Sequence, residues 1–69
     1  MGFNAYKEFE KIKKSLVEKG YSKEVPIEEF GKEIMLDLGC SRKRAIQWIR
    51  NFEIVGFIND KGDKVIILK

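Results

Sequence analysis

The sequence contains no histidine and only one cysteine, Cys40, among its 69 residues. A single cysteine excludes an internal disulfide, and without histidine there is no conventional zinc ligand set and no histidine-based acid–base site. No apolar run approaches the roughly 18 residues that span a bilayer, and no secretory signal pattern opens the chain. We therefore expect one small domain, residues 1–69, located in the cytoplasm and without a membrane partner.

Motifs that indicate an enzyme are missing as well. There is no GxxxxGK phosphate-binding loop, and Cys40 has no histidine or second cysteine to activate it, so we interpret it as structural. Four acids, Glu28, Glu29, Glu33 and Asp37, follow an expected helical face, which we interpret as exposed and solvated rather than catalytic or metal-binding. We expect no enzymatic activity, no cofactor, no metal and no small-molecule substrate.

Lysine, glutamate and isoleucine are abundant, whereas glutamine occurs once. This bias is typical of proteins from thermophiles. It also fits an AT-rich genome, and the sequence does not separate these two explanations.

The formal net charge of +3 is distributed unevenly along the chain. Residues 26–40 carry one lysine against four acids, whereas residues 41–52 carry four bases and no acid. The four bases are Arg42, Lys43, Arg44 and Arg50. Positive charge concentrated in one segment is typical of a surface that contacts nucleic acid.

Residues 3–20 have the period of an amphipathic helix, with Asn4 as its expected N-cap and Gly20 at its end. The expected buried stripe consists of Ala5, Phe9, Ile12 and Leu16. Phe3, Tyr6 and Val17 lie on a shoulder beside this stripe. We expect them to widen the buried face; contact with another subunit is the alternative.

Two more helices are expected at residues 27–38 and 41–52. Pro26 suits the start of the first and Gly39 its end, and Ser41 is a favourable N-cap for the second. Two helices joined by a short turn that contains glycine have the layout of a helix-turn-helix. The expected buried positions are Ile27, Phe30, Ile34 and Leu38 in one helix and Ala45, Trp48, Ile49 and Phe52 in the other.

The C-terminal segment changes to a β pattern. Residues 57–58 and 65–68 are rich in β-branched and aromatic side chains, and residues 59–63 form a loop with a glycine, which together predict a hairpin. A hairpin alone is marginally stable, so the extended residues 22–25 are a candidate third strand. Both faces of the last strand are apolar, and one stays exposed in a monomer unless the first helix covers it.

The stretch LGCSRKRAIQWIRNFEIVGFI, residues 38–58, resembles the winged helix-turn-helix pattern L-G-x-S-x-x-x-(V/A)-x-x-x-I-x-x-(L/F)-E-x-x-G-(L/F)-I. The matching residues are Leu38, Gly39, Ser41, Ala45, Ile49, Phe52, Glu53, Gly56, Phe57 and Ile58. The resemblance extends from about residue 24 to the last residue, and it implies an α+β fold of three helices and a C-terminal hairpin wing. Size and composition also resemble small regulators from archaeal or bacterial mobile elements.

The resemblance implies sequence-specific binding of double-stranded DNA by a transcriptional regulator. Helix 41–52 would lie in the major groove, with the wing on the adjacent backbone or minor groove. The residues point to the same helix, because arginine and lysine hydrogen-bond guanine, glutamine pairs with adenine, and isoleucine contacts the thymine methyl group. The expected DNA contacts are Ser41, Arg42, Lys43, Arg44, Ile46, Gln47, Arg50, Lys61 and Lys64.

Some of these side chains have alternative interpretations. Arg42 and Arg44 could instead pair with acids of the preceding helix, such as Glu33 or Asp37. Trp48 could be a platform on which bases stack, but its helical phase favours the core.

The wing and the whole domain also leave alternatives open. Asp60 and Asp63 cancel the local field of Lys61, which departs from strongly basic wings. The rival function is a winged-helix protein–protein interaction module whose basic helix binds an acidic protein. One domain offers a small DNA contact area, so we expect a homodimer formed by the helix shoulder or the outer face of the last strand.

Overall fold

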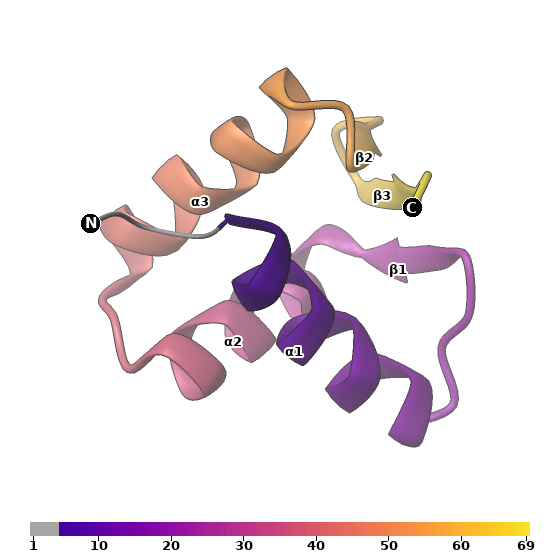
Figure 1. The fold of residues 1–69 in the computed structure, drawn as a ribbon, viewed down its shortest axis with the longest axis horizontal. Coiled ribbons are helices and arrows are strands. Elements are labelled where there is room, and N and C mark those ends of the chain that lie inside the picture. The colour runs from indigo at the N-terminus through magenta and orange to yellow at the C-terminus, as the bar shows by residue number, and fades with distance from the viewer. Residues whose placement is uncertain (1–4) are drawn as a thin grey trace.

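The computed structural model describes residues 5–69; the expected N-cap Asn4 and the shoulder residue Phe3 lie outside this range. Within it the chain is α+β, with three helices and a small three-stranded antiparallel sheet (Figure 1). No helix of this part is long and apolar enough to cross a membrane. The elements are α1 (Ala5–Glu18), β1 (Glu24–Pro26), α2 (Ile27–Leu38), α3 (Arg42–Ile54), β2 (Ile58–Asp60) and β3 (Lys64–Ile67).

The apolar faces expected of the three helices are buried or partly buried. Helix α3 continues two residues beyond its expected end, to Ile54. The buried helical residues of the core are Phe9, Ile12, Leu16, Phe30, Ile34, Ala45, Ile49 and Phe52. The period of the sequence therefore identified the correct face of each helix.

Phe52 is fully buried and contacts aromatic rings from elsewhere in the core. Its ring centroid lies 5.3 Å from Phe9 of α1 and 6.4 Å from Phe30 of α2, both edge to face. Trp48 and Phe57 lie at 5.4 Å and 6.2 Å. The expectation that Trp48 packs against the core is confirmed, and Phe52 joins α3 to both other helices.

The three strands pair in the order β1-β3-β2. The expected third strand is present, at Glu24–Pro26 rather than 22–25, and it pairs with β3. Strand β2 also differs from its expected position, because pairing with β3 continues to Asp60 and leaves only residues 61–63 for the turn. Val25, Ile58, Val65 and Ile67 are the buried strand residues.

Two glycines determine where α2 and α3 end. Gly39 has φ 61° and Gly56 has φ 84°, in the left-handed region where a Cβ atom is strained. After α3, the N–H of Phe57 donates to the carbonyl of Phe52 over 2.9 Å, which satisfies a carbonyl of the last turn. The sharp turns from α2 into α3 and from α3 into the hairpin therefore depend on Gly39 and Gly56.

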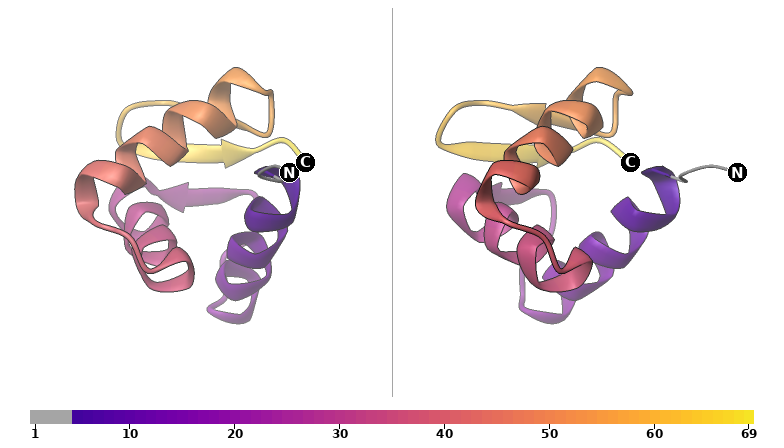
Figure 2. Two further views of the ribbon diagram at one scale, coloured as in Figure 1. Left: turned by 60° about the vertical axis from the view of Figure 1, so that its left-hand side comes forward. Right: turned by 90° about the vertical axis from the view of Figure 1, so that its left-hand side faces the viewer.

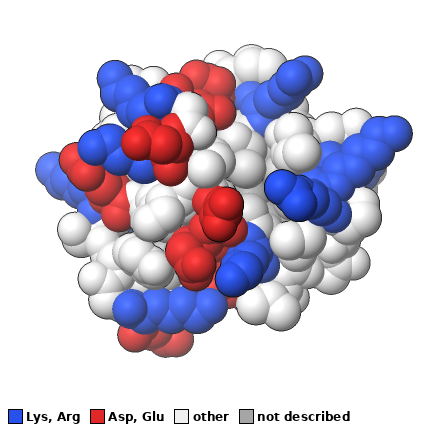
Figure 3. Space-filling view, turned by 180° about the vertical axis from the view of Figure 1, so that it is seen from behind, with Lys and Arg blue, Asp and Glu red and all other residues white. Residues whose placement is uncertain are grey.

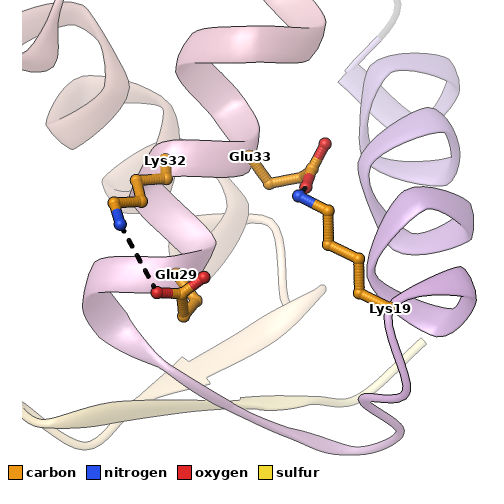
Figure 4. A network of polar contacts seen from close by, with 4 residues as sticks. All are labelled: Lys19, Glu29, Lys32 and Glu33. Atoms are coloured by element: carbon orange, nitrogen blue, oxygen red, sulfur yellow. Dashed lines mark hydrogen bonds and ion pairs between the residues drawn. The ribbon is translucent and has the colours of Figure 1, made fainter.

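Glu33 of α2 is buried, so the interpretation that all four acids of this helix are solvated was wrong. It is 3% exposed, and its Oε1 lies 2.5 Å from Nζ of Lys19, just after α1 (Figure 4). The hydrogen bond to Glu33 raises the pKa of Lys19. Glu29, by contrast, makes a partly exposed 3.7 Å pair with Lys32 on its own helix. A buried carboxylate needs such a partner, and this pair joins α1 to α2.

Asp37 lies one turn beyond Glu33 and is half-buried. Burial raises the pKa of Asp37, and the Glu33 carboxyl adds to this, while a hydrogen bond from Ser15 and the charge of Lys19 oppose it. Its Oδ2 is buried and has no hydrogen-bond partner among the described residues. The ionised form of Asp37 is therefore disfavoured by folding.

The shoulder of α1 does not widen the buried face as expected. Val17 is 54% exposed and Tyr6 is 48% exposed, although the Tyr6 ring packs edge to face against Phe57 at 5.6 Å. On the outer face of the last strand Ile66 is half-buried and Leu68, just beyond it, is 57% exposed. Apolar surface therefore remains open near both ends of the described chain.

Replacing Phe52 by alanine should unfold the protein. Loss of a buried phenylalanine costs about 3–5 kcal/mol, and a core of this size supplies about the same in total. Far-UV circular dichroism at room temperature should show a largely unfolded Phe52→Ala chain. Leu36→Ala, at a side chain 71% exposed, serves as the control and should change the free energy of unfolding by less than about 0.5 kcal/mol. A cooperative native-like transition for Phe52→Ala would contradict this.

The Asp37→Asn variant should be more stable than the native protein at pH 7. The folded pKa of Asp37 lies above its reference value of 3.8, so the unfolded chain ionises first and stability falls as pH rises through this window. Urea unfolding curves should therefore separate at pH 7 and converge below pH 3.8. Asp63→Asn, at an exposed turn, is the control. A less stable Asp37→Asn protein at pH 7 would refute this account.

Candidate nucleic-acid interface

Helix α3 begins with a side-chain cap at Ser41. Its Oγ accepts a hydrogen bond from the backbone N–H of Arg44 at 3.3 Å, and its backbone is extended, as an N-cap requires. The hydroxyl keeps its own O–H to donate to another group. Ser41 thus fixes the first turn of α3, at the exposed position where we expected a phosphate contact.

The side of α3 opposite the core carries Lys43, Gln47 and Arg50, and Arg42 and Arg44 lie on its two flanks; we define these five residues as the basic face. All five are exposed. Lys43, Gln47 and Arg50 face solvent because Ala45, Ile49 and Phe52 are buried on the opposite side of the helix. Ile46, beside them, is 49% exposed. The structure therefore brings together every predicted contact residue of this helix.

Ile54 belongs to the same surface but was missed by the sequence analysis. It follows Arg50 by four residues, which places it on the same helical face, and it is 81% exposed. The expected helix ended at residue 52, so the sequence did not predict that Ile54 lies on this face. The extended helix shows that the basic face has an apolar end.

None of the ion pairs recorded within residues 5–69 involves α3. Those pairs join Lys11 to Glu8, Lys19 to Glu33, Lys32 to Glu29 and Lys64 to Glu24. Arg42 and Arg44 therefore form no ion pair with Glu33 or Asp37, the alternative considered for them. Seen from behind, the right-hand side of the molecule shows lysine and arginine without acids, whereas both signs mix elsewhere (Figure 3). The one acid of α3, Glu53, is exposed in its last turn.

A groove of about 450 Å³ lies between α2 and α3, beside the basic face. Arg42 and Ile46 line it on the α3 side, and Glu28 and Lys32 line it on the α2 side. Neither was predicted as a contact, because a charge count along the chain does not show which side chains adjoin α3. Because Lys32 stands beside Glu28 and pairs with Glu29, the α2 side of the groove adds no surplus positive charge.

The hairpin turn differs electrostatically from α3, although it reaches past the helices in the right-hand view of Figure 2. Lys64 pairs with Glu24 at 3.2 Å, and Asp60 Oδ1 accepts the N–H of Gly62 at 2.8 Å. Lys61 is exposed in the turn but lies between two acids in sequence. The predicted contacts Lys61 and Lys64 therefore carry no surplus positive charge.

Other chemistry finds little support in the described residues. Cys40 is half-buried, and its Sγ lies 3.9 Å from the carbonyl oxygen of Ile34. Between residues 5 and 69 no three Cys, Asp or Glu side chains are grouped so that they could hold a metal ion. Comparison with family models, curated proteins and solved structures finds no match to this chain. The residues of α3 are therefore the features of this chain that point to a function.

Replacing Ser41 by alanine should destabilise the fold through the loss of the cap. The Arg44 N–H would lose its acceptor, at a cost of about 1 kcal/mol, whereas Ser41→Gly should cost only a few tenths of this. Urea denaturation of both variants measures the two values. Equal losses for alanine and glycine, or no loss for alanine, would show that the cap does not contribute.

Proposed function

We propose that this chain is a winged helix-turn-helix protein that binds double-stranded DNA sequence-specifically and regulates transcription, with α3 in the major groove. The observation that carries the proposal is the basic face of α3. It exposes four positive side chains and a glutamine without an ion pair among the described residues. Such a surface attracts an anionic partner and speeds its association.

The dimensions of α3 support a groove of duplex DNA as the partner. The major groove is about 12 Å wide and admits an α-helix. From Lys43 through Gln47 to Arg50 the helix rises roughly 10 Å, which corresponds to about three base pairs. The turn at Gly39 separates α3 from α2 sharply, so that the exposed side of α3 forms an edge of the molecule (Figure 1).

The order of the elements supports the winged-helix assignment. The short strand β1 leads into α2, the two helices follow each other across a short turn, and a hairpin completes the sheet. This is the arrangement implied by the sequence resemblance.

Within this proposal each residue type has a role. Lys43 and Arg50 donate to guanine, Gln47 pairs with adenine, and Ile46 contacts a thymine methyl group. Arg42 and Arg44, on the flanks, contact phosphates, as does the O–H of Ser41. Lys61 and Lys64 contribute at most a backbone contact, because acids beside them cancel their charge.

The neutral hairpin turn is the one observation that favours the second candidate function. A wing without surplus positive charge adds little to DNA affinity. The basic face of α3 would then bind an acidic protein, and the protein would be an interaction module. The two functions differ in whether duplex DNA competes for α3.

Binding to duplex DNA over a salt series tests the proposal. Site selection from a random duplex pool should yield a preferred sequence for the native protein. Lys43→Ala/Gln47→Ala/Arg50→Ala should lose this preference, since each good base contact is worth about 1–3 kcal/mol. Its affinity should also depend less steeply on salt, because two positive groups are gone.

The control variant is Lys14→Ala/Lys23→Ala, which removes the same amount of charge from exposed positions outside α3. It should keep the sequence preference. If both variants lose affinity equally, binding is only electrostatic and the proposal fails. If the native protein does not bind above ~100 mM salt, α3 serves a protein partner instead.

A further inference from the structure

An apolar patch surrounds Phe57 where three parts of the chain meet. We define this Phe57 patch as Tyr6, Val55, Phe57 and Leu68. Tyr6, Val55 and Leu68 are 48%, 51% and 57% exposed. In both views of Figure 2 the start of α1, the end of α3 and the C-terminus lie on the same side of the molecule. Tyr6 and Leu68 each contact Phe57, and exposed apolar side chains gathered in one place are typical of interaction sites.

Hydrogen bonds hold the Phe57 patch in a defined arrangement. The N–H of Leu68 donates to the carbonyl of Phe57 over 2.8 Å, and the Tyr6 ring packs against the Phe57 ring. Nζ of Lys13 donates to the carbonyl of Lys69 over 2.5 Å. The side chain of Leu68 is therefore exposed on a backbone that hydrogen bonds hold at Leu68 and at Lys69. Little conformational entropy would be lost when a partner covers it.

The charges beside the Phe57 patch are of both signs. Tyr6 Oη donates to Glu10 Oε2 over 2.9 Å, so that an acid stands at one side of the patch. Lys13, three residues later on α1, stands beside Leu68 through its bond to Lys69. An interface with two-fold symmetry places each residue opposite a different residue of an identical surface. Glu10 of one copy can then face Lys13 of the other.

We propose that the Phe57 patch joins two copies of this chain about a two-fold axis. A strongly acidic protein or a nucleic acid would be drawn to the basic face of α3, whereas this patch is apolar with balanced charge. A second copy supplies an apolar surface of equal shape and the complementary order of acid and base. The inference from the patch does not depend on what α3 binds.

The position of the Phe57 patch also suits the proposed function, and this step rests on that proposal. Val55 directly follows α3, seven residues or about 10 Å beyond Trp48 at its middle. With a further ~5 Å for side chains and the α3 axes directed at the two-fold axis, the middles of the two helices would lie on the order of 30 Å apart. That is near the 34 Å turn of DNA that separates half-sites.

Sedimentation equilibrium without DNA tests the interface. The native protein should sediment at twice its chain mass of 8.1 kDa. Leu68→Asp should sediment as a monomer, because it would bury a charge against an apolar surface. Leu36→Asp is the matched control, since Leu36 is 71% exposed on α2 outside the patch, and it should remain a dimer. Thermal unfolding followed by circular dichroism verifies that both variants are folded.

Charge reversal distinguishes a two-fold contact from other association. Glu10→Lys and Lys13→Glu should each raise the dimer dissociation constant about tenfold, which is in the range for a close interfacial pair. The double variant should recover most of the native value, because it restores opposite charges across the axis. Failure of the double variant to recover would overturn the proposed symmetry.

Two further outcomes would overturn the interface. If the native protein is monomeric at about 100 µM, the proposed dimer does not form. If Leu36→Asp dissociates the dimer and Leu68→Asp does not, the dimer interface lies on another surface. Either result leaves DNA binding by α3 intact. A dimer that binds no duplex DNA would refute the proposed function and not the interface, so the two failures can be told apart.

Discussion

The packing of Phe52 is the interaction on which the rest of the structure depends. Its ring contacts Phe9 and Phe30, so one side chain positions α3 against both α1 and α2. Once that face of α3 is buried, the geometry of a helix leaves Lys43, Gln47 and Arg50 no direction except solvent. The arrangement of the basic face is therefore a consequence of the aromatic core.

Positions governed by local rules could be predicted from the sequence. Helical period, the Ser41 cap and the glycine turn placed Lys43 and Arg50 on the exposed face of α3, with Arg42 and Arg44 on its flanks. Burial of Glu33 could not be predicted, because its partner Lys19 follows a different helix and only the packing of α1 on α2 brings them together. The expectation that Val17 widens the buried face of α1 failed for the same reason. Helical periodicity shows which side chains share a face of the helix, whereas tertiary contacts determine how much of that face is buried.

Charge pairing separates α3 from the other elements. Near α1, α2 and the hairpin, lysines have nearby glutamates, and their mutual attraction offsets part of the cost of ordering. On α3 no two bases stand three or four residues apart, so they do not face one another across a helical turn. Their charges have no acid within ion-pair distance among the described residues, so this side of α3 is a surface that attracts anions.

The strand order has a consequence for synthesis on the ribosome. The central strand, β3, comes last in the chain, and it alone pairs with both β1 and β2. Val25, which is fully buried, therefore gains its strand partner Val65 only after α2, α3 and β2 have been translated. Until β3 leaves the exit tunnel, the emerging helices hold an incomplete core, so this domain completes its fold only after β3 has been translated.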